Sequence, residues 1–423
     1  MKILMIATDP DGLAWAVRCQ AAGHKVRVWY GVKSTIGDGL ITKVPEWKPH
    51  MGWADLIFIT ENCKLGPELA TYFKTGYPIV GANQKGAELE LDRIKGQKVF
   101  ENAGIETLEY EEFSSYDKAI AFIRKEGKAY VAKPWGGTSD KALSYVPPRG
   151  YEVEAMEWKL RRWKEEGLKG KFILQECVRG TEVGVSGWFG PGGFNRWIEE
   201  DWEEKKLMNG GLGPNTGEQG TIVRHVKESK LFDDMLLPLE DQLAKIDYVG
   251  CINVNCGMDK QGQLRPYELT MRPGWPDFDI LQRLIQGDPA EWMLDLFEGK
   301  DTLKMSPKVA VGVVLSHGDY PQGELTDPAA AGFPIYGVTE ANVEKISPCL
   351  IRQGKGGLET AGTYVMVVTG LGDSVSAARD DAYATIKEIK WPGDMMYRTD
   401  IGERLKKELP LLQEFGYAEG MEY

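Results

Sequence analysis

Two lysines, Lys133 and Lys141, lie eight positions apart on either side of a run of small residues. Lys133 follows the short apolar run 130–132, and the small residues occupy positions 136–139. A lysine at the end of a buried strand reaches a phosphate group, and a loop of small residues lets backbone N–H groups approach the same phosphate. The pattern predicts a nucleotide-binding site. Taken alone, Lys133 is more typical of a solvent-exposed strand end, so the prediction depends on a second segment.

That second segment is the apolar strand and acidic end at 172–182. Backbone groups from Glu176 to Val178 are expected to read the edge of an adenine ring, and Glu182 to accept hydrogen bonds from ribose hydroxyls. The two segments together predict an ATP-binding cleft between two sheets.

The first ninety residues supply the alternation of elements that would position such a site. Short apolar runs predict strands, and the run 11–22, which ends at Gly23, predicts a helix. Alternating strands and helices indicate a doubly wound parallel sheet, whose ligands bind at the carboxyl ends of the strands. This places 8–12 and 61–64 at a candidate substrate edge. The predicted strands are 2–7, 26–30, 56–60 and 79–81.

The rest of the chain predicts a mixed α/β architecture. Helical periodicity and glycine stops predict four helices, whereas 190–220 is rich in glycine and predicts loops. Two strands around the turn 259–262 predict a hairpin. From residue 308 onward, strands and one helix predict a small α+β domain. The helices are expected at 87–103, 116–126, 151–169 and 233–245, the hairpin strands at 250–258 and 264–269, and the last elements at 309–315, 363–369 and 374–389.

Composition limits the class of protein. At about 150 residues per domain, a chain of 423 residues predicts roughly three domains. With 51 basic and 63 acidic residues the net charge is −12, which disfavours a sequence-independent nucleic-acid binder. No apolar run reaches the length of a membrane span, and 1–7 is too short for a signal peptide. Six cysteines without a Cys-x-x-Cys pair are typical of reduced thiols, so we expect a cytoplasmic protein without a zinc site.

Read in order, these segments resemble the glycinamide ribonucleotide synthetases (phosphoribosylamine–glycine ligases) of the ATP-grasp superfamily. The string Gly-Pro-Asn-Thr-Gly at 213–217 is the most specific match, and the strand Tyr267–Glu268 with its continuation to Asp277 is the next. The resemblance runs from end to end, through Val311–Val314 to Arg398–Gly402. It implies an amino-terminal doubly wound domain at 1–90, an ATP-grasp domain at 91–308 with a lid at about 115–182, and a carboxy-terminal α+β domain at 309–423.

The resemblance also implies roles for individual residues, with ATP and Mg²⁺ (or Mn²⁺) as cofactors. The nucleotide set is Lys133, Lys141, Gln175, Glu176, Val178 and Glu182. The substrate set is Asp9, Asp11, Glu61, Asn215, Thr216, Arg272, Gly274 and Asp277. The metal set is Glu268, Thr270 and Asn255, and the catalytic set is Arg272 and Lys141.

The sequence departs from the family pattern at two places, one in the substrate-binding loop and one in the metal-binding strand. The loop that grips the substrate phosphate, Gly-Gly-Arg-Glu-His in the family, reads Asp9-Pro10-Asp11-Gly12-Leu13 here. Carboxylates repel a phosphate. As an alternative, Asp9 and Asp11 cap the first helix. In the metal strand, Thr270 stands where the family has asparagine, so a weaker oxygen ligand replaces an amide.

Three functions follow from these observations. The first is an ATP-dependent carboxylate–amine ligase that forms an amide through an acyl phosphate, with glycine as the carboxylate. Its amine is phosphoribosylamine or another amine in a specialised nucleotide or nucleobase modification pathway. The second is an inactive ATP-binding relative, and the third, which the charge disfavours, is a protein that modifies DNA or RNA. Small-molecule substrates, no membrane partner and a monomer or homodimer are expected.

Overall fold

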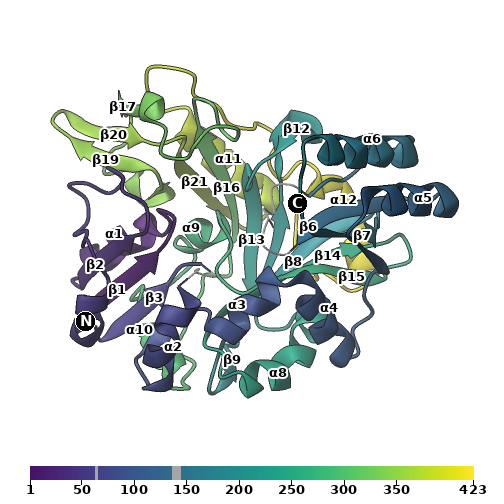
Figure 1. The fold of residues 1–423 in the computed structure, drawn as a ribbon. Helices are drawn as coiled ribbons and strands as arrows, with labels where there is room; N and C mark the ends of the chain where they lie inside the picture. The colour runs from purple at the N-terminus through teal and green to yellow at the C-terminus, as the bar shows by residue number, and fades with distance from the viewer. Residues whose placement is uncertain (62–64, 136–143) are drawn as a thin grey trace. The chain divides into compact units, whose positions relative to one another are not determined.

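A computed structural model describes residues 1–61, 65–135 and 144–423. The chain forms two compact units, which we call the first and second units. The first unit comprises Met1–Ala87, Val183–Val254 and Thr270–Tyr423. The second unit comprises Glu88–Glu182 and Asn255–Leu269. Figure 1 shows the elements of both.

The amino-terminal part of the first unit is a parallel sheet, as the alternation of elements predicts. Its strands lie in the order β2-β1-β3-β4, and every neighbouring pair is parallel. Ile3 to Ile6 are fully buried, which explains why β1 is a continuous apolar run. The strands are β1 (Lys2–Ala7), β2 (Lys25–Tyr30), β3 (Leu56–Ile59) and β4 (Ile79–Val80), and the helices are α1 (Leu13–Ala21) and α2 (Gly66–Lys74), with a 3₁₀ turn at Lys48–Trp53.

A larger antiparallel sheet forms the centre of the first unit. The order β8-β10-β13-β16-β21-β18 joins strands from the middle and the end of the chain. Helix α11 packs on β21 and β16. The elements are β8 (Thr181–Gly190), β10 (Ile198–Glu203), β13 (Gly220–Val226), β16 (Val309–Ser316), β18 (Ile346–Pro348), β21 (Tyr364–Gly372) and α11 (Val375–Ile386).

Smaller elements complete the first unit. A three-stranded sheet has the order β17-β20-β19, and β11 pairs with β12. The strands are β9 (Gly193–Phe194), β11 (Lys206–Met208), β12 (Leu212–Asn215), β17 (Ala331–Pro334), β19 (Ile351–Gly354) and β20 (Gly357–Ala361). The helices are α7 (Lys230–Met235), α8 (Glu240–Lys245), α9 (Asp277–Leu281), α10 (Glu291–Phe297) and α12 (Leu405–Glu414).

The second unit contains the antiparallel sheet β5-β7-β6. Helices α5 and α6 bury Ile123, Leu160 and Trp163 in a core shared with Phe172 of this sheet. The strands are β5 (Tyr110–Phe113), β6 (Tyr130–Trp135) and β7 (Lys171–Glu176). The other elements are α4 (Arg93–Asn102), α5 (Tyr116–Glu126), α6 (Glu152–Glu165) and the hairpin strands β14 (Gly250–Met258) and β15 (Leu264–Thr270), of which β14 begins and β15 ends in the first unit.

Three expectations from the sequence are corrected. The predicted helix 87–103 is two helices, α3 (Gln84–Leu91) and α4, because Asp92 accepts hydrogen bonds from the N–H groups of Ile94 and Lys95 and starts a new helix. The predicted helix 233–245 is likewise broken at Pro238, within a 3₁₀ turn at Leu237–Leu239. The region 190–220, predicted as loops, contains the buried strand β10.

Candidate nucleotide and substrate sites

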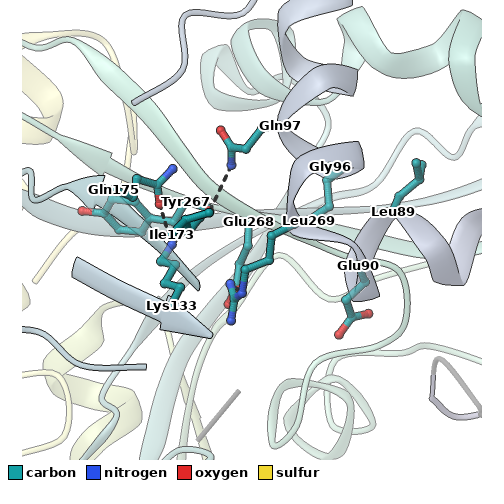
Figure 2. Close-up of a pocket in the computed structure, with 11 residues that line it drawn as sticks. Leu89, Glu90, Gly96, Gln97, Lys133, Ile173, Gln175, Tyr267, Glu268 and Leu269 are labelled. Carbon is teal, nitrogen blue, oxygen red and sulfur yellow. Dashed lines mark hydrogen bonds and ion pairs between the residues drawn. The ribbon is translucent and has the colours of Figure 1, made fainter. Parts of the chain in front are cut away.

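A pocket lies within the second unit, where α3 and α4 meet β6, β7 and β15 (Figure 2). It holds about 280 Å³ of empty space, part of it open solvent. Its walls are formed by Leu89, Glu90, Arg93, Gly96, Gln97, Lys133, Ile173, Gln175, Tyr267, Glu268 and Leu269. Lys133, Gln175 and Glu268, which the sequence assigned to nucleotide and metal binding, therefore share one pocket.

Lys133 extends from β6 into this pocket and is only 8% exposed. Its Nζ donates to the Oε1 of Gln175 at 2.7 Å and to the carbonyl oxygen of Tyr267 at 3.3 Å. Gln175 Nε2 is buried without a hydrogen-bond partner among the described residues. A buried cation and an unsatisfied donor on neighbouring strands are suited to bind an anionic or oxygen-rich ligand.

Glu268 forms an ion pair with Arg93, whose Nη1 lies 2.9 Å from Oε2 of Glu268. Arg93 is the first residue of α4. Arg93 was not among the residues predicted from the sequence, although it directly follows Asp92, whose type is typical of a helix N-cap. The ion pair fixes the orientation of the Glu268 carboxylate at the wall of the pocket. A bound cation would compete with the guanidinium group of Arg93 for this carboxylate.

The remaining predicted nucleotide residues lie at the ends of strands in the second unit. The N–H groups of Glu176 and Cys177 already donate to backbone carbonyls, at 2.8 and 3.0 Å. They are therefore not free to read an adenine edge, which leaves the carbonyl groups and Val178 for that role. Glu182 is exposed on β8. Lys141 lies outside the described residues.

The other two predicted metal ligands lie on the hairpin strands. Asn255 is partly buried on β14, and Thr270 is buried at the end of β15.

In the first unit, the predicted substrate edge is formed where β1 and β3 end. The carboxylate of Glu61 accepts hydrogen bonds from the N–H and the hydroxyl group of Thr8, and from the N–H of Asp9 at 3.3 Å. Burial raises the pKa of Glu61, although the hydrogen bonds from Thr8 oppose that shift. The acids after β1 and β3 therefore lie together, as the topology of a parallel sheet predicts.

Asp11 does not cap the first helix, contrary to the alternative that the sequence left open. The N-cap of α1 is Gly12, with a φ of 81°, and no side chain caps the helix. Instead, Oδ1 of Asp11 accepts a hydrogen bond from the hydroxyl of Tyr364 at 3.0 Å. Burial raises the pKa of Asp11, opposed by that hydrogen bond and by the charge of Arg272. Asp11 is therefore placed by a contact with β21, which no local sequence pattern indicates.

Aromatic rings connect this edge to the Gly-Pro-Asn-Thr-Gly loop. The ring of Trp275 lies 4.6 Å from that of Tyr364 between centroids. A Cβ atom at Gly217 would lie 3.1 Å from the Trp275 indole, so the loop approaches the ring closely. Thr216 donates its hydroxyl to the carbonyl of Lys205 at 2.8 Å, and Asn215 is exposed on β12. The loop and β21 thus meet at Trp275, and Tyr364 connects them to Asp11.

Gly274 and Asp277 occupy the turn that leads into α9. A Cβ atom at Gly274 would lie 2.4 Å from Oδ2 of Asp277, so this turn requires glycine. Arg272 is half-buried, and its Nη1 donates to the carbonyl of Pro273 at 3.0 Å. Burial raises the pKa of Asp277 well above its usual value, and the neighbouring Glu199 and Glu203 raise it further. Asp277 is therefore part of a buried acidic cluster rather than an exposed surface.

Comparison with known proteins agrees with this architecture. Residues 310–404 match the family "Phosphoribosylglycinamide synthetase, C domain". A phosphoribosylamine–glycine ligase from Vibrio vulnificus is 26% identical over 357 residues, covering 80% of this chain and 82% of its own. One from Ralstonia nicotianae is 25% identical over 437 residues, covering 96% and 99%.

Solved structures of similar proteins have the same fold. The phosphoribosylamine–glycine ligase of Thermotoga maritima superimposes with a TM-score of 0.74 at 20% identity, covering 95% of this chain and 100% of its own. This chain is therefore similar to phosphoribosylamine–glycine ligases over most of its length. An N5-carboxyaminoimidazole ribonucleotide synthetase from Thermotoga maritima shares the fold more distantly, with a TM-score of 0.61, 14% identity, and coverage of 93% and 99%. The fold is that of the ATP-grasp enzymes.

Within the described ranges, no helix combines the length and the apolar character that a membrane-spanning segment needs.

Proposed function

We propose that this protein is an ATP-dependent carboxylate–amine ligase that releases ADP and phosphate. In this reaction the carboxylate of an amino acid attacks the γ-phosphate of ATP, and an amine then attacks the acyl phosphate to form an amide. The observation that carries the proposal is the buried Lys133, held by Gln175 in a pocket that also contains Glu268. Charge develops on phosphate oxygens during such a transfer, so a preplaced cation stabilises the transition state.

A divalent metal ion completes the proposed nucleotide site. Glu268 offers a carboxylate in the pocket, and Asn255 and Thr270 offer neutral oxygens on the same hairpin. This set of hard oxygen donors fits Mg²⁺ or Mn²⁺. When bound, the ion supplies positive charge to the phosphate oxygens. Lys133 would hold the phosphate in position, whereas Arg93 would keep Glu268 oriented between turnovers.

We propose glycine as the carboxylate, because the curated relatives are named phosphoribosylamine–glycine ligases. The amine is proposed to differ. Asp9, Asp11 and Glu61 stand at the edge where the family grips a phosphate, and like charges repel by roughly 1 kcal/mol per pair at 4 Å in water and by more in a cleft. An amine that bears hydroxyl groups or a second positive charge suits these acids better.

We also propose that the protein acts on small molecules in the cytoplasm, as a monomer or homodimer. An inactive ATP-binding relative is the competing function, motivated by Thr270 in place of the family's asparagine.

An ADP-release screen across amino acids and amines, with mass spectrometry of the products, tests the proposal. We expect ADP release that requires both an amino acid and an amine, and a product mass equal to their sum minus water. ATP binding without such release would favour the inactive relative. Glycine-dependent release with phosphoribosylamine at about 1–1000 per second, a typical enzymatic rate, would show that the amine is the family's own.

A further inference from the structure

Strand β10 carries acidic residues on both of its faces, in the first unit. Because side chains alternate along a strand, Glu199, Asp201 and Glu203 share one face and Glu200 points to the other. Glu200 is fully compensated: its Oε2 lies 2.7 Å from Arg224 and its Oε1 accepts from Ser229 at 2.7 Å. The opposite face differs, and its acids meet those of two other segments.

We call this group the carboxylate cluster. Its members come from β10, from the residue after the Gly-Pro-Asn-Thr-Gly loop, and from the start of α9: Glu199, Asp201, Glu203, Glu218 and Asp277. Carboxylate oxygens of Glu199, Asp201 and Asp277 all lie within 4.8 Å of one another, and so do those of Glu203, Glu218 and Asp277. Asp201 is 0% and Asp277 is 3% exposed, so solvent does not separate these charges.

Two basic side chains contact the cluster. Lys205 lies 2.5 Å from Glu203, and Nε2 of His225 lies 3.3 Å from Glu199. The thiol of Cys251 lies close enough to interact with Glu199, Asp201 and Asp277, and also with Arg272. Lys205 and His225 each form an ion pair with one outer member. The charge of Lys205 also acts to lower the pKa of the central pair, Asp201 and Asp277, but burial and the neighbouring acids raise the pKa of both by more.

The central pair has unsatisfied oxygens. Oδ1 of Asp201 and Oδ1 of Asp277 are buried, and neither has a hydrogen-bond partner among the described residues. The other oxygen of Asp201 is held by Asn253, whose Nδ2 donates to it at 3.1 Å and to Ser186 at 2.9 Å. A buried acceptor without a donor is costly, and a buried charge without a partner is costlier. Both oxygens are therefore suited to act as ligands of a cation.

We infer that the carboxylate cluster binds a divalent cation, Mg²⁺ or Mn²⁺, through Glu199, Asp201 and Asp277, independently of ATP. The ligands are hard oxygens, which these ions prefer, and metal–oxygen distances of about 2.0–2.6 Å allow ligand oxygens to lie as far apart as observed here. The ion would fix α9 to β10. Asp277 also lies within 4.8 Å of Glu218, at the end of the loop that packs on Trp275, so by holding Asp277 the ion would act as a positioning ion for the substrate edge.

The test is a titration of the nucleotide-free full chain with Mn²⁺, followed by electron paramagnetic resonance. We expect a bound ion in the wild type and in Glu200→Gln, the matched control on the opposite face of β10. Binding should also persist in Glu268→Gln, which alters only the nucleotide pocket. It should weaken by at least roughly 10- to 100-fold in Asp201→Asn and in Asp277→Asn, which remove a ligand charge.

Folding of the variants is checked by thermal unfolding with and without Mn²⁺. Because Asn removes a buried acid that lies beside other acids, Asp201→Asn should be at least as stable as the wild type without the ion, and the ion should stabilise it less than it stabilises the wild type. The wild type should become more stable to thermal unfolding when Mn²⁺ is added. No binding by the nucleotide-free wild type, or binding that Asp201→Asn retains and Glu268→Gln loses, would overturn the inference. Neither result depends on whether the proposed ligase reaction occurs.

Discussion

The ammonium group of Lys133 lies 2.7 Å from the amide oxygen of Gln175, and both side chains are buried on neighbouring strands of one sheet. The acceptor is neutral, so this contact orients the ammonium group without supplying a countercharge of its own. Burial of a lysine is unfavourable, and pairing with a bound phosphate would offset this cost. This arrangement is the strongest structural reason to assign the pocket of the second unit to a nucleotide.

The first prediction concerns this lysine. Lys133→Ala should weaken ATP binding by about 1.5–3 kcal/mol, the range for a charged hydrogen bond, as measured by calorimetry. Lys171→Ala is the matched control, because Lys171 lies on β7 of the same sheet but is exposed. Equal ATP affinity in Lys133→Ala and the wild type would remove Lys133 from the nucleotide site.

The second prediction concerns the metal strand. Glu268→Gln should abolish or strongly reduce the Mg²⁺ dependence of ATP binding, because it removes the charged oxygen in the pocket. Thr270→Asn should tighten apparent Mg²⁺ binding, because it restores an amide oxygen. Both effects are read from ATP affinity at a series of Mg²⁺ concentrations. If Glu268→Gln behaves as the wild type and Thr270→Asn changes nothing, the metal ligands lie elsewhere.

Local patterns predicted much of this fold. The parallel strands, helix α5 and the hairpin of β14 and β15 were all expected from periodicity and turn residues, because their patterns are local. Strand β10 was missed because its sequence, Ile-Glu-Glu-Asp-Trp-Glu, reads as exposed. Its acids are buried because of partners elsewhere in the chain, such as Arg224, and no local pattern shows that a charge will be compensated.

The candidate sites were likewise predicted only in part, because local patterns do not show contacts between distant segments. The sequence placed Asp9, Asp11 and Glu61 at one edge, because the carboxyl ends of parallel strands coincide. It did not supply Tyr364, which lies 353 positions from Asp11 and holds it by a hydrogen bond. Nor did it supply Arg93, which faces Glu268 from another element. Contacts of this kind depend on tertiary packing and become visible only in the structure.

The third prediction concerns the amine. If Asp11 recognises a positive or hydroxylated amine, Asp11→Asn should raise KM for that amine by about 10- to 150-fold, as expected for a lost charged hydrogen bond of 1.5–3 kcal/mol. The KM for ATP should not change. Tyr364→Phe should have a smaller effect of the same sign, because it loosens Asp11 without removing its charge. Improved use of phosphoribosylamine by Asp11→Asn would support charge repulsion as the basis of selectivity, and an unchanged KM for every amine would contradict it.

The last prediction concerns the pH dependence of stability. Burial raises the pKa of Glu61 above its ordinary value of 4.5, despite the hydrogen bonds from Thr8. Between pH 4.5 and the raised pKa, the folded protein therefore keeps a proton that the unfolded chain has released. The free energy of unfolding should fall as pH rises through this window, by up to about 1.4 kcal/mol per pH unit for one proton, and level off above it.

Glu61→Gln should remove this contribution, so its stability should fall less steeply with pH and exceed that of the wild type at the upper end of the window. Glu46→Gln, at an exposed position of the same unit, is the control and should keep the wild-type slope. Denaturant unfolding at a series of pH values measures both. A cationic amine bound beside Glu61 would favour its ionised form, and so should flatten the wild-type curve toward that of Glu61→Gln. Parallel curves for the wild type and Glu61→Gln would show that this carboxyl does not titrate abnormally.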